Sequence, residues 1–262
     1  MSDDLIYTVN ENIGHIVLNR PRRRNALTFE MYHRIGKICA TAGSINDPDQ
    51  VKIIIISGSG DAAFASGTDI AQFNDFASGG DGIAYENMLE AVMCQIENCK
   101  VPTISALHGF VTGGGVGIAA ACDIRLGSAD LRLGVPIART LGNCLALGTL
   151  RRFVALIGEA RTKYILLTAE LIDAKEAQSA GFISEILTEK ALVIDRALEL
   201  AKKMASFAPL TMNVTKAALQ RLKTTVDLPN DHDLIALAYG SQDFQEGRKA
   251  FFEKREPNWT GI

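Results

Sequence analysis

Long apolar runs are absent from this sequence. No stretch approaches the roughly 18 consecutive apolar residues that a membrane-spanning helix needs. Met1–Val9 begins with acidic residues and passes directly into a strand pattern, so the chain also shows neither a signal peptide nor an Arg-rich transit segment. We therefore expect no membrane partner and a cytoplasmic location.

Cysteine motifs and a strong charge of either sign are also missing. The cysteines are odd in number and show neither a C-x-x-C pair nor a metal-ligand spacing; they are Cys39, Cys94, Cys99, Cys122 and Cys144. We interpret them as reduced core residues. The formal net charge of -3 makes nucleic acid an unexpected partner, although Arg20–Arg24 is a local basic cluster.

The remaining composition is that of an ordinary globular protein. With 262 residues, 47% hydrophobic and 22% charged, the chain is long enough for one large domain, or a domain with an appendage, around a substantial core. Leu5–Val9 and His15–Leu18 alternate as two strands of a hairpin. Val51–Ser57 is a nearly continuous β-branched run, which is typical of a strand buried on both faces of a parallel sheet. These patterns predict a hairpin and a parallel sheet with a buried strand.

The stretch His108–Asp123, HGFVTGGGVGIAAACD, has the shape of strand, glycine turn and buried helix. Glycine lets a ligand approach the backbone closely, and the first N–H groups of a helix have no intrahelical partner. Such a turn can bind an anion or oxyanion. A Walker-type phosphate loop is disfavoured, because Val116 and Gly117 follow the triplet in place of Lys and Ser or Thr. Close helix packing alone is the other interpretation.

The same arrangement occurs a second time. The strand Val51–Ser57 leads into the loop Gly58–Asp69, GSGDAAFASGTD, and a helix begins at Ile70. Two such loops from neighbouring strands could direct two backbone N–H groups at one point. An enzyme can build an oxyanion hole in this way without charged side chains.

The segment Arg20–Leu27, RPRRRNAL, carries four arginines around a proline that ends the second strand. Thr28 follows as the expected N-cap of a helix that runs to about Ala42. Two interpretations stay open for the arginines: a solvated loop, or side chains that face phosphate groups.

Beyond Leu145 the apolar spacing is helical. We expect helices over Leu145–Leu156, Glu159–Leu167, Ala174–Ala180, Glu189–Ser206, Leu210–Leu222 and roughly His232–Lys254, with a strand near Phe182–Leu187. A composition shift near Ala208-Pro209 marks the start of a C-terminal helical region. Apolar faces on these last helices would be partly exposed in a monomer, which favours a homo-oligomer.

Three separated motifs resemble, in order and spacing, those of the crotonase family, also called the enoyl-CoA hydratase/isomerase family. They are RNAL at 24–27, AFASGTDIAQF at 63–73 and HGFVTGGGVGIAAACDIRLGSAD at 108–130, and FFEKREPNWTG resembles the closing segment of the family. The resemblance implies an α/β crotonase-like β-β-α spiral with two nearly perpendicular sheets over 1–207, which holds the acyl-CoA site. A C-terminal helical oligomerisation region over 208–262 and a homotrimer or hexamer (a dimer of trimers) are also implied.

Members of that family bind acyl-CoA thioesters and stabilise an enolate through two peptide N–H groups. Carried over by position, these are the N–H of Thr68 and the N–H of Gly114, the middle residue of the glycine triplet. The thioester oxygen gains charge in the transition state, so a preformed pair of donors stabilises it. The resemblance implies no metal and no cofactor beyond the coenzyme A moiety of the substrate.

Further residues are placed around the ligand by the same resemblance. The adenine and ribose phosphate of CoA are expected near Arg24, Asn25, Ala26 and Leu27. The remaining candidates for binding the substrate are Ala65, Ser66, Gly67, Asp69, Ile70, Gly113 and Ile137. Phe252 and Lys254 of the closing segment are candidates for contacting the CoA of a neighbouring subunit, with simple solvation as the alternative for Lys254. Asp69, just before a helix, is expected to act as an N-cap rather than an acid.

The catalytic side chains are where the sequence departs from the family. Hydratases use two glutamates, one on each side of the enoyl double bond. Gly117 and Ile137 stand at those two positions here. The expected helix Tyr85–Cys99 carries Glu86 and Glu90 on one face. In the dehalogenase branch of the family a catalytic histidine lies on the corresponding helix, and Glu90 stands at that position in this chain. Glu90 is therefore the candidate acid/base; the alternative is that it lies on a solvated face of the helix.

Four more residues, on the segment that lines the acyl pocket in relatives, are weaker candidates: Arg139, Thr140, Asn143 and Cys144. Cys144 is more simply explained as a packing residue than as a nucleophile. His108 is expected to make a loop hydrogen bond rather than to act in catalysis.

The reaction expected on these grounds is nominally the hydration of a 2-enoyl-CoA, because it is the commonest in the family. Double-bond isomerisation, dehalogenation, carbon–carbon hydrolysis and decarboxylation on acyl-CoA are the alternatives among enzymes. The missing glutamates also leave open a catalytically silent binding scaffold.

Overall fold

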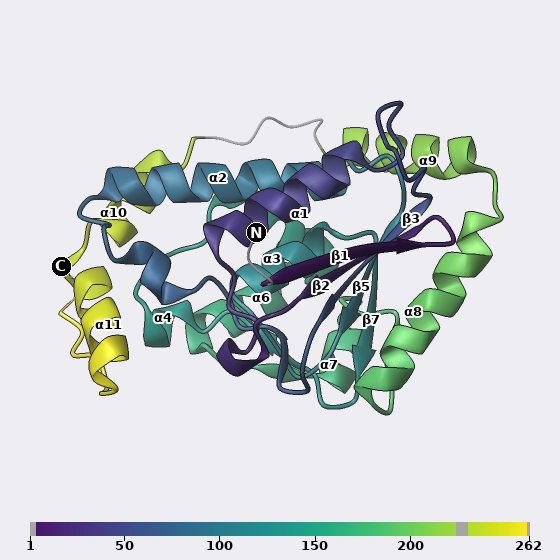
Figure 1. The fold of residues 1–262 in the computed structure, drawn as a ribbon. Coiled ribbons are helices and arrows are strands. Elements are labelled where there is room, and N and C mark those ends of the chain that lie inside the picture. The colour runs from purple at the N-terminus through teal and green to yellow at the C-terminus, as the bar shows by residue number, and fades with distance from the viewer. Residues whose placement is uncertain (1–3, 224–229, 261–262) are drawn as a thin grey trace.

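The computed structural model describes residues 4–223 and 230–260, and its strands form two sheets (Figure 1). The large sheet has the order β1-β2-β3-β5-β7-β10 and the small sheet the order β4-β6-β8-β9. The strands are β1 (Leu5–Asn10), β2 (Ile13–Leu18), β3 (Ile53–Gly58), β4 (Ala63–Ala65), β5 (Thr103–Leu107), β6 (Phe110–Thr112), β7 (Ile124–Ser128), β8 (Arg132–Gly134), β9 (Ile172–Asp173) and β10 (Glu185–Leu187).

A β-β-α unit repeats along the chain. In the large sheet β3, β5 and β7 are parallel neighbours, and each is followed by its partner in the small sheet, β4, β6 or β8. A helix follows each pair. The helices are α1 (Phe29–Thr41), α2 (Gly79–Glu97), α3 (Gly114–Ala121), α4 (Ile137–Thr140), α5 (Leu147–Ile157), α6 (Glu159–Thr168), α7 (Ala174–Ser179), α8 (Lys190–Ala205), α9 (Pro209–Lys223), α10 (His232–Tyr239) and α11 (Gln242–Glu253), with 3-10 turns η1 (Pro21–Arg23) and η2 (Ile70–Phe73). The predicted α/β spiral is confirmed.

Strand β3 shows why the large sheet needs helices on both faces. All of its residues are buried. Ile54 and Ile56 join the core under α1 and α2, whereas Ile53 and Ile55 pack against α8. Figure 1 shows α8 along one face of the sheet, with α1 and α3 on the other. The continuous β-branched run is therefore explained by burial on two faces.

Helix α2 begins earlier than the sequence predicts, at Gly79 rather than Tyr85. Ser78 and Asp81 form a capping box that supports a start in a glycine-rich segment. Gly79 and Gly82 have a packing role, because a Cβ at either position would overlap α10, at Ala236 or at the ring of Tyr239. Two glycines that look like helix breakers thus let α10 approach α2 closely.

The C-terminal region also differs from the prediction. The single helix expected over roughly 232–254 is divided into α10 and α11 at Gly240, and the Ser241 side chain caps α11 by accepting from Phe244 N at 3.0 Å. Helix α9 buries none of its described side chains. Its exposed apolar residues include Leu210, Val214, Leu219 and Leu222, and α10 exposes Leu234 and Leu237. Assembly as a trimer or hexamer stays a prediction, as does the boundary at residue 207.

Candidate active site

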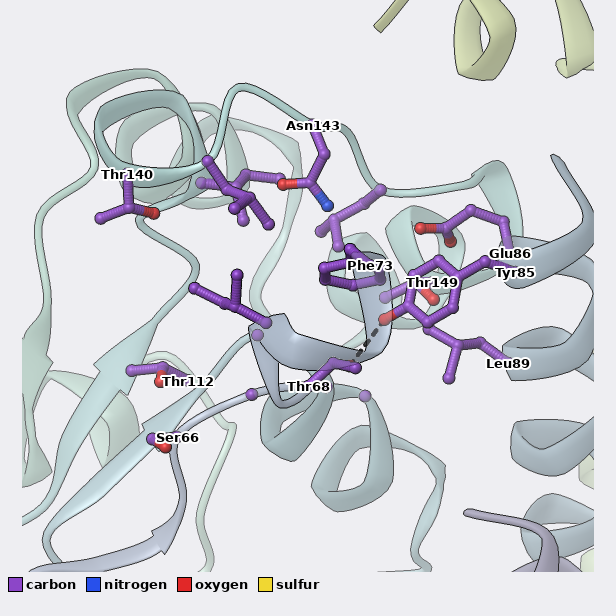
Figure 2. A pocket seen from close by; sticks show the side chains of 18 of the residues that line it. Ser66, Thr68, Phe73, Tyr85, Glu86, Leu89, Thr112, Thr140, Asn143 and Thr149 are labelled. Atoms are coloured by element: carbon purple, nitrogen blue, oxygen red, sulfur yellow. Dashed lines mark hydrogen bonds between the residues drawn. The ribbon is translucent and has the colours of Figure 1, made fainter. Parts of the chain in front are cut away.

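A cavity of about 120 Å³ lies between the two glycine-bearing loops, α2 and the segment 136–149 (Figure 2). The loops contribute Ser66, Gly67, Thr68, Thr112, Gly113 and Gly114. Helix α2 contributes Tyr85, Glu86, Leu89 and Met93. Most of the remaining wall is apolar, with Ile70, Phe73, Pro136, Ile137, Leu141 and Leu145. A mainly apolar pocket with a few placed polar groups is usual for a small-molecule site.

The backbone N–H of Thr68 faces away from Leu27. Leu27 N donates to Gly67 O, and Asp69 N donates to Leu27 O, both at 2.8 Å. Because N–H directions alternate along an extended chain, the N–H of Thr68 points to the opposite side. The turn at Gly113 and Gly114 packs against this loop, since a Cβ built on Gly67 would lie 3.8 Å from Gly114 N.

Gly114 is the first residue of α3, so its N–H has no partner within the helix. Gly113, at φ 51°, makes the turn into α3 in a conformation that a side chain would strain. Within residues 4–223 and 230–260, neither the Thr68 N–H nor the Gly114 N–H donates a hydrogen bond. Both residues line the cavity. Convergence of the two N–H groups on one acceptor stays a prediction.

Three hydroxyls lie beside these amides. The Thr68 hydroxyl is 2.8 Å from the Tyr32 hydroxyl and 2.6 Å from the Tyr85 hydroxyl (Figure 2 shows the second of these bonds). Burial raises the pKa of both phenols well above its ordinary value. A Cβ on Gly114 would overlap the hydroxyl of Tyr32. Glycine at 114 therefore makes room for a buried tyrosine directly behind the turn.

The other end of α3 is fixed by Arg125. Its buried guanidinium donates to the carbonyls of Ala119, Cys122 and Asp123, and Nε donates to Phe182 O at 2.7 Å. A cation at a helix C-terminus satisfies the last carbonyls and is favoured by the helix dipole. The position of α3, and with it the position of Gly114, is thus fixed from β7.

Glu86 is the one carboxylate that lines the cavity, among the residues that the structure describes. Its side chain is 4% exposed. Tyr239 Oη donates to Oε1 at 2.8 Å, and Ala146 N donates to Oε2 at 3.3 Å. Burial raises the pKa of Glu86 to about 7, and the nearby charges of Asp231 and Glu90 add to this rise, while the two hydrogen bonds oppose it. Such a group exchanges protons near neutral pH.

Glu90, the carboxylate to which the family register points, lies outside the cavity lining. Arg152 binds it with two hydrogen bonds of 2.5 and 2.9 Å and also pairs with the buried Glu97. Burial tends to raise the pKa of Glu90, but the bonds and charge of Arg152 outweigh it and hold that pKa below its ordinary value. Both glutamates stand on the same side of α2, and sequence reasoning selected the one that joins an ion pair instead of the one that faces the cavity.

The four residues of the predicted CoA-binding segment 24–27 differ in how far they are buried. The side chain of Asn25 is fully buried and braces the loops by donating to Ser59 O and Ala63 O at 2.9 and 2.8 Å. Leu27 is also fully buried, whereas Ala26 is partly exposed. Arg24 is exposed, with its guanidinium 5.1 Å from the centre of the Phe110 ring. Contact of any of these residues with CoA stays a prediction.

Other predicted binding residues lie at the cavity: Ser66, Gly67, Ile70, Gly113 and Ile137 line it. Ala65 is fully buried in β4, outside the lining. Asp69 is the N-cap of η2, accepting from Ala71 N at 3.2 Å, and it pairs with Arg20 at 2.8 Å. The expectation of an N-cap at Asp69 is confirmed.

The two positions of the missing hydratase glutamates are both at the cavity, since Gly117 and Ile137 line it. Thr140 and Asn143 line it too, whereas Arg139 and Cys144 do not. Burial raises the pKa of the Cys144 thiol to about 12, which leaves it protonated at neutral pH.

His108 makes the loop hydrogen bond that the sequence predicts, with Nε2 3.0 Å from Gly60 O. Burial, together with the charge of Lys190, lowers its pKa to about 4. Phe252, in the last turn of α11, and Lys254, its C-cap, are exposed and lie away from the cavity lining. Their contact with a neighbouring subunit stays a prediction.

Two general findings concern the described part of the chain. None of its helices is both long enough and apolar enough to cross a membrane. Its His, Cys, Asp and Glu side chains nowhere gather in a group of three that could hold a metal ion.

Comparison with known proteins agrees with the fold. The family model described as enoyl-CoA hydratase/isomerase matches residues 8–262. The chain belongs to this family, and it is therefore a crotonase-family acyl-CoA enzyme.

Individual relatives cover nearly the whole chain. It is similar to the crotonyl-CoA hydratase of Syntrophomonas wolfei, with 31% identity over 98% of each chain. It is also similar to the peroxisomal Delta(3,5)-Delta(2,4)-dienoyl-CoA isomerase of Arabidopsis thaliana, with 29% identity over 97% of this chain and 94% of the relative. Among solved structures, an enoyl-CoA hydratase/isomerase family protein of Hyphomonas neptunium aligns with a TM-score of 0.77 and 33% identity, covering 99% and 98% of the two chains.

Proposed function

We propose that this protein moves a proton at the α-carbon of a short-chain enoyl-CoA, with double-bond isomerisation as its reaction. The observation that carries the proposal is the single carboxylate, Glu86, among the described residues of the cavity. Isomerisation removes a proton at one carbon and returns it at another, so one carboxylate is sufficient.

The polarising groups in this proposal are the N–H groups of Thr68 and Gly114. Both belong to cavity-lining residues and lack another acceptor within the described chain. When the α-proton leaves, negative charge moves onto the thioester oxygen, and two fixed donors stabilise that charge more than the neutral carbonyl. This arrangement needs no metal and no cofactor beyond the coenzyme A moiety of the substrate.

Glu86 acts as base and then as acid. Its carboxylate takes the α-proton of a 3-enoyl thioester, which forms a dienolate with its charge on the thioester oxygen. The protonated Glu86 then gives that proton to the γ-carbon, and the double bond moves into conjugation with the carbonyl. A pKa of about 7 suits both steps, because the group gains and loses its proton at little cost near neutral pH.

The similarity to the crotonyl-CoA hydratase of Syntrophomonas wolfei favours a short acyl group.

Hydration of a 2-enoyl-CoA is the second candidate, and the similarity to the crotonyl-CoA hydratase of Syntrophomonas wolfei favours it. In that case Glu86 would take a proton from the attacking water and deliver it to the α-carbon. With Gly117 and Ile137 at the usual glutamate positions, the same carboxylate would have to serve both purposes.

Two substrates distinguish the candidates. An isomerase converts vinylacetyl-CoA to crotonyl-CoA, and the absorbance of the conjugated thioester rises. A hydratase acts on crotonyl-CoA, and that absorbance falls. If neither substrate turns over but both bind, isomerisation and hydration are refuted in favour of another family reaction or a silent scaffold.

Glu86→Gln and Glu90→Gln form a matched pair of variants from adjacent turns of α2. We expect Glu86→Gln to lower kcat by about 100-fold or more, the usual effect of removing a general acid/base, and Glu90→Gln to stay within about threefold of the wild type. Full activity of Glu86→Gln would refute the assignment, and loss of activity only in Glu90→Gln would restore the prediction from the family register.

A further inference from the structure

We propose that Tyr239, from the C-terminal helix α10, is a positioning residue that orients the Glu86 carboxylate at the acyl cavity and favours its ionised form. The inference rests on the proposed function, in which Glu86 carries the proton. It also gives the C-terminal region a part in the chemistry, in addition to the assembly role that the sequence predicts.

A third residue, Asn143, determines that the Tyr239 hydroxyl donates its hydrogen to Glu86. Asn143 Nδ2 lies 3.0 Å from Tyr239 Oη, which lies 2.8 Å from Glu86 Oε1. An amide NH₂ group only donates, so the phenol oxygen accepts from Asn143 and directs its own hydrogen to the carboxylate. The chain of donors therefore runs from Asn143 through Tyr239 to Glu86.

Both carboxylate oxygens of Glu86 are held. Tyr239 donates to Oε1, and Ala146 N donates to Oε2 at 3.3 Å. Two donors from different elements fix the plane of the carboxylate and leave each oxygen one further lone pair. Hydrogen bonds of this kind favour the charged form.

Tyr239 is placed rigidly enough for this role. Its side chain is fully buried, and α10 packs against α2 where Gly79 and Gly82 allow a close approach. Its ring lies 6.0 Å from the ring of Tyr85, the residue next to Glu86, and 4.9 Å from that of Phe244 on α11. The phenol is held between two helices of the C-terminal region and α2.

The same network includes part of the cavity wall. Asn143 lines the cavity, and Ala146 lies on the same segment between α4 and α5. An acyl group that displaced this segment would change both donors to the glutamate network and, with them, the proton affinity of Glu86.

The charged groups facing Glu86 work against its own charge, and they are the carboxylates Asp231 and Glu90. The phenols Tyr85 and Tyr32 and the thiol Cys144 also face it, but their raised pKa values keep them neutral. No Lys or Arg forms an ion pair with Glu86 in the described ranges 4–223 and 230–260. Burial raises its pKa to about 7, and the Tyr239 bond is the largest influence in the opposite direction.

The first test is the pH dependence of kcat/KM for Tyr239→Phe. Loss of the donor should move the acid limb upward by about one pH unit, while activity at high pH, where Glu86 is ionised in any case, stays within about threefold of the wild type. Tyr164→Phe is the matched control, because Tyr164 is an exposed tyrosine on α6 that does not line the cavity. An acid limb that does not move would overturn the inference, because the Tyr239 hydrogen bond would then have no influence on the ionisation of Glu86.

A second readout does not need turnover. The infrared band of a protonated carboxyl group that disappears in Glu86→Gln reports the proton on Glu86 directly. Its titration midpoint should rise in Tyr239→Phe and, by a smaller amount, in Asn143→Leu, which keeps the tyrosine and serves if the first variant does not fold. Unchanged midpoints in the variants that fold would overturn the inference. If no acyl-CoA reacts at all, the proposed function fails while this measurement still decides the role of Tyr239.

Discussion

The buried carboxylate of Glu86 should make the protein less stable as the pH rises toward neutrality. Its pKa is raised from an ordinary 4.5 to about 7, chiefly because burial disfavours the charge. The folded state therefore binds this proton more tightly than the unfolded chain. The stabilising contribution is complete below 4.5 and is lost as the pH rises through about 7.

The size of this effect follows from the two pKa values. Each tenfold change in proton affinity corresponds to about 1.4 kcal/mol, so the gap between 4.5 and about 7 amounts to about 3 kcal/mol. Glu86→Gln cannot lose a proton. The free energy of unfolding of this variant minus that of the wild type should thus increase by about 3 kcal/mol between acid and mildly alkaline pH.

Urea denaturation of both proteins at one concentration, in steps from about pH 5 to about pH 8, measures the difference. Glu90→Gln is the control, and the difference between its stability and that of the wild type should stay constant over this range. Arg152 lowers the pKa of Glu90 below its ordinary 4.5, so the stabilising contribution of that carboxylate is complete above 4.5 and is lost only at more acid pH. Parallel stability curves for Glu86→Gln and the wild type would refute the reasoning, because they would show that Glu86 titrates as it does in water.

Three further substitutions test the packing around the site by urea denaturation. Gly114→Ala should destabilise by about 1–3 kcal/mol and impair activity, because its Cβ would overlap the buried hydroxyl of Tyr32. Gly117→Ala, in the same helix, should gain up to about 1 kcal/mol, since its Cβ would make only ordinary contacts of 3.4 and 3.6 Å; equal losses in the two variants would contradict this contrast. Arg152→Met should cost about 3 kcal/mol by leaving the buried Glu97 without its closest cation, and a change below about 1 kcal/mol would exclude the buried pair as a stabilising feature.

Features set by short stretches of sequence could be predicted. The hairpin of β1 and β2, the doubly buried β3 and the N-cap at Thr28 all follow from local patterns, and the structure confirms them. The two glycine-bearing loops were also identifiable, because each combines a buried strand with a helix start. Their arrangement around one cavity depends on the spiral, which entered through the family resemblance.

Features set by long-range packing could not be predicted. Glu86 and Glu90 share one side of α2, so helical periodicity cannot separate them. What distinguishes the two glutamates is contact with residues far along the chain. Arg152, 62 positions after Glu90, forms an ion pair with it, and Tyr239, 153 positions after Glu86, holds Glu86 at the cavity. The early start of α2 has a similar cause, because its glycines serve contact with α10.

The groups assigned to the thioester oxygen belong to the main chain, and this limits what ordinary mutagenesis can reveal. Replacing Thr68 by any residue except proline keeps its amide hydrogen, so a scan of side chains would pass over the polarising step. Semisynthesis that exchanges the amide nitrogen of residue 68 or 114 for an ester oxygen removes one donor and little else. A residue can thus be indispensable at the level of its peptide bond and replaceable at the level of its side chain.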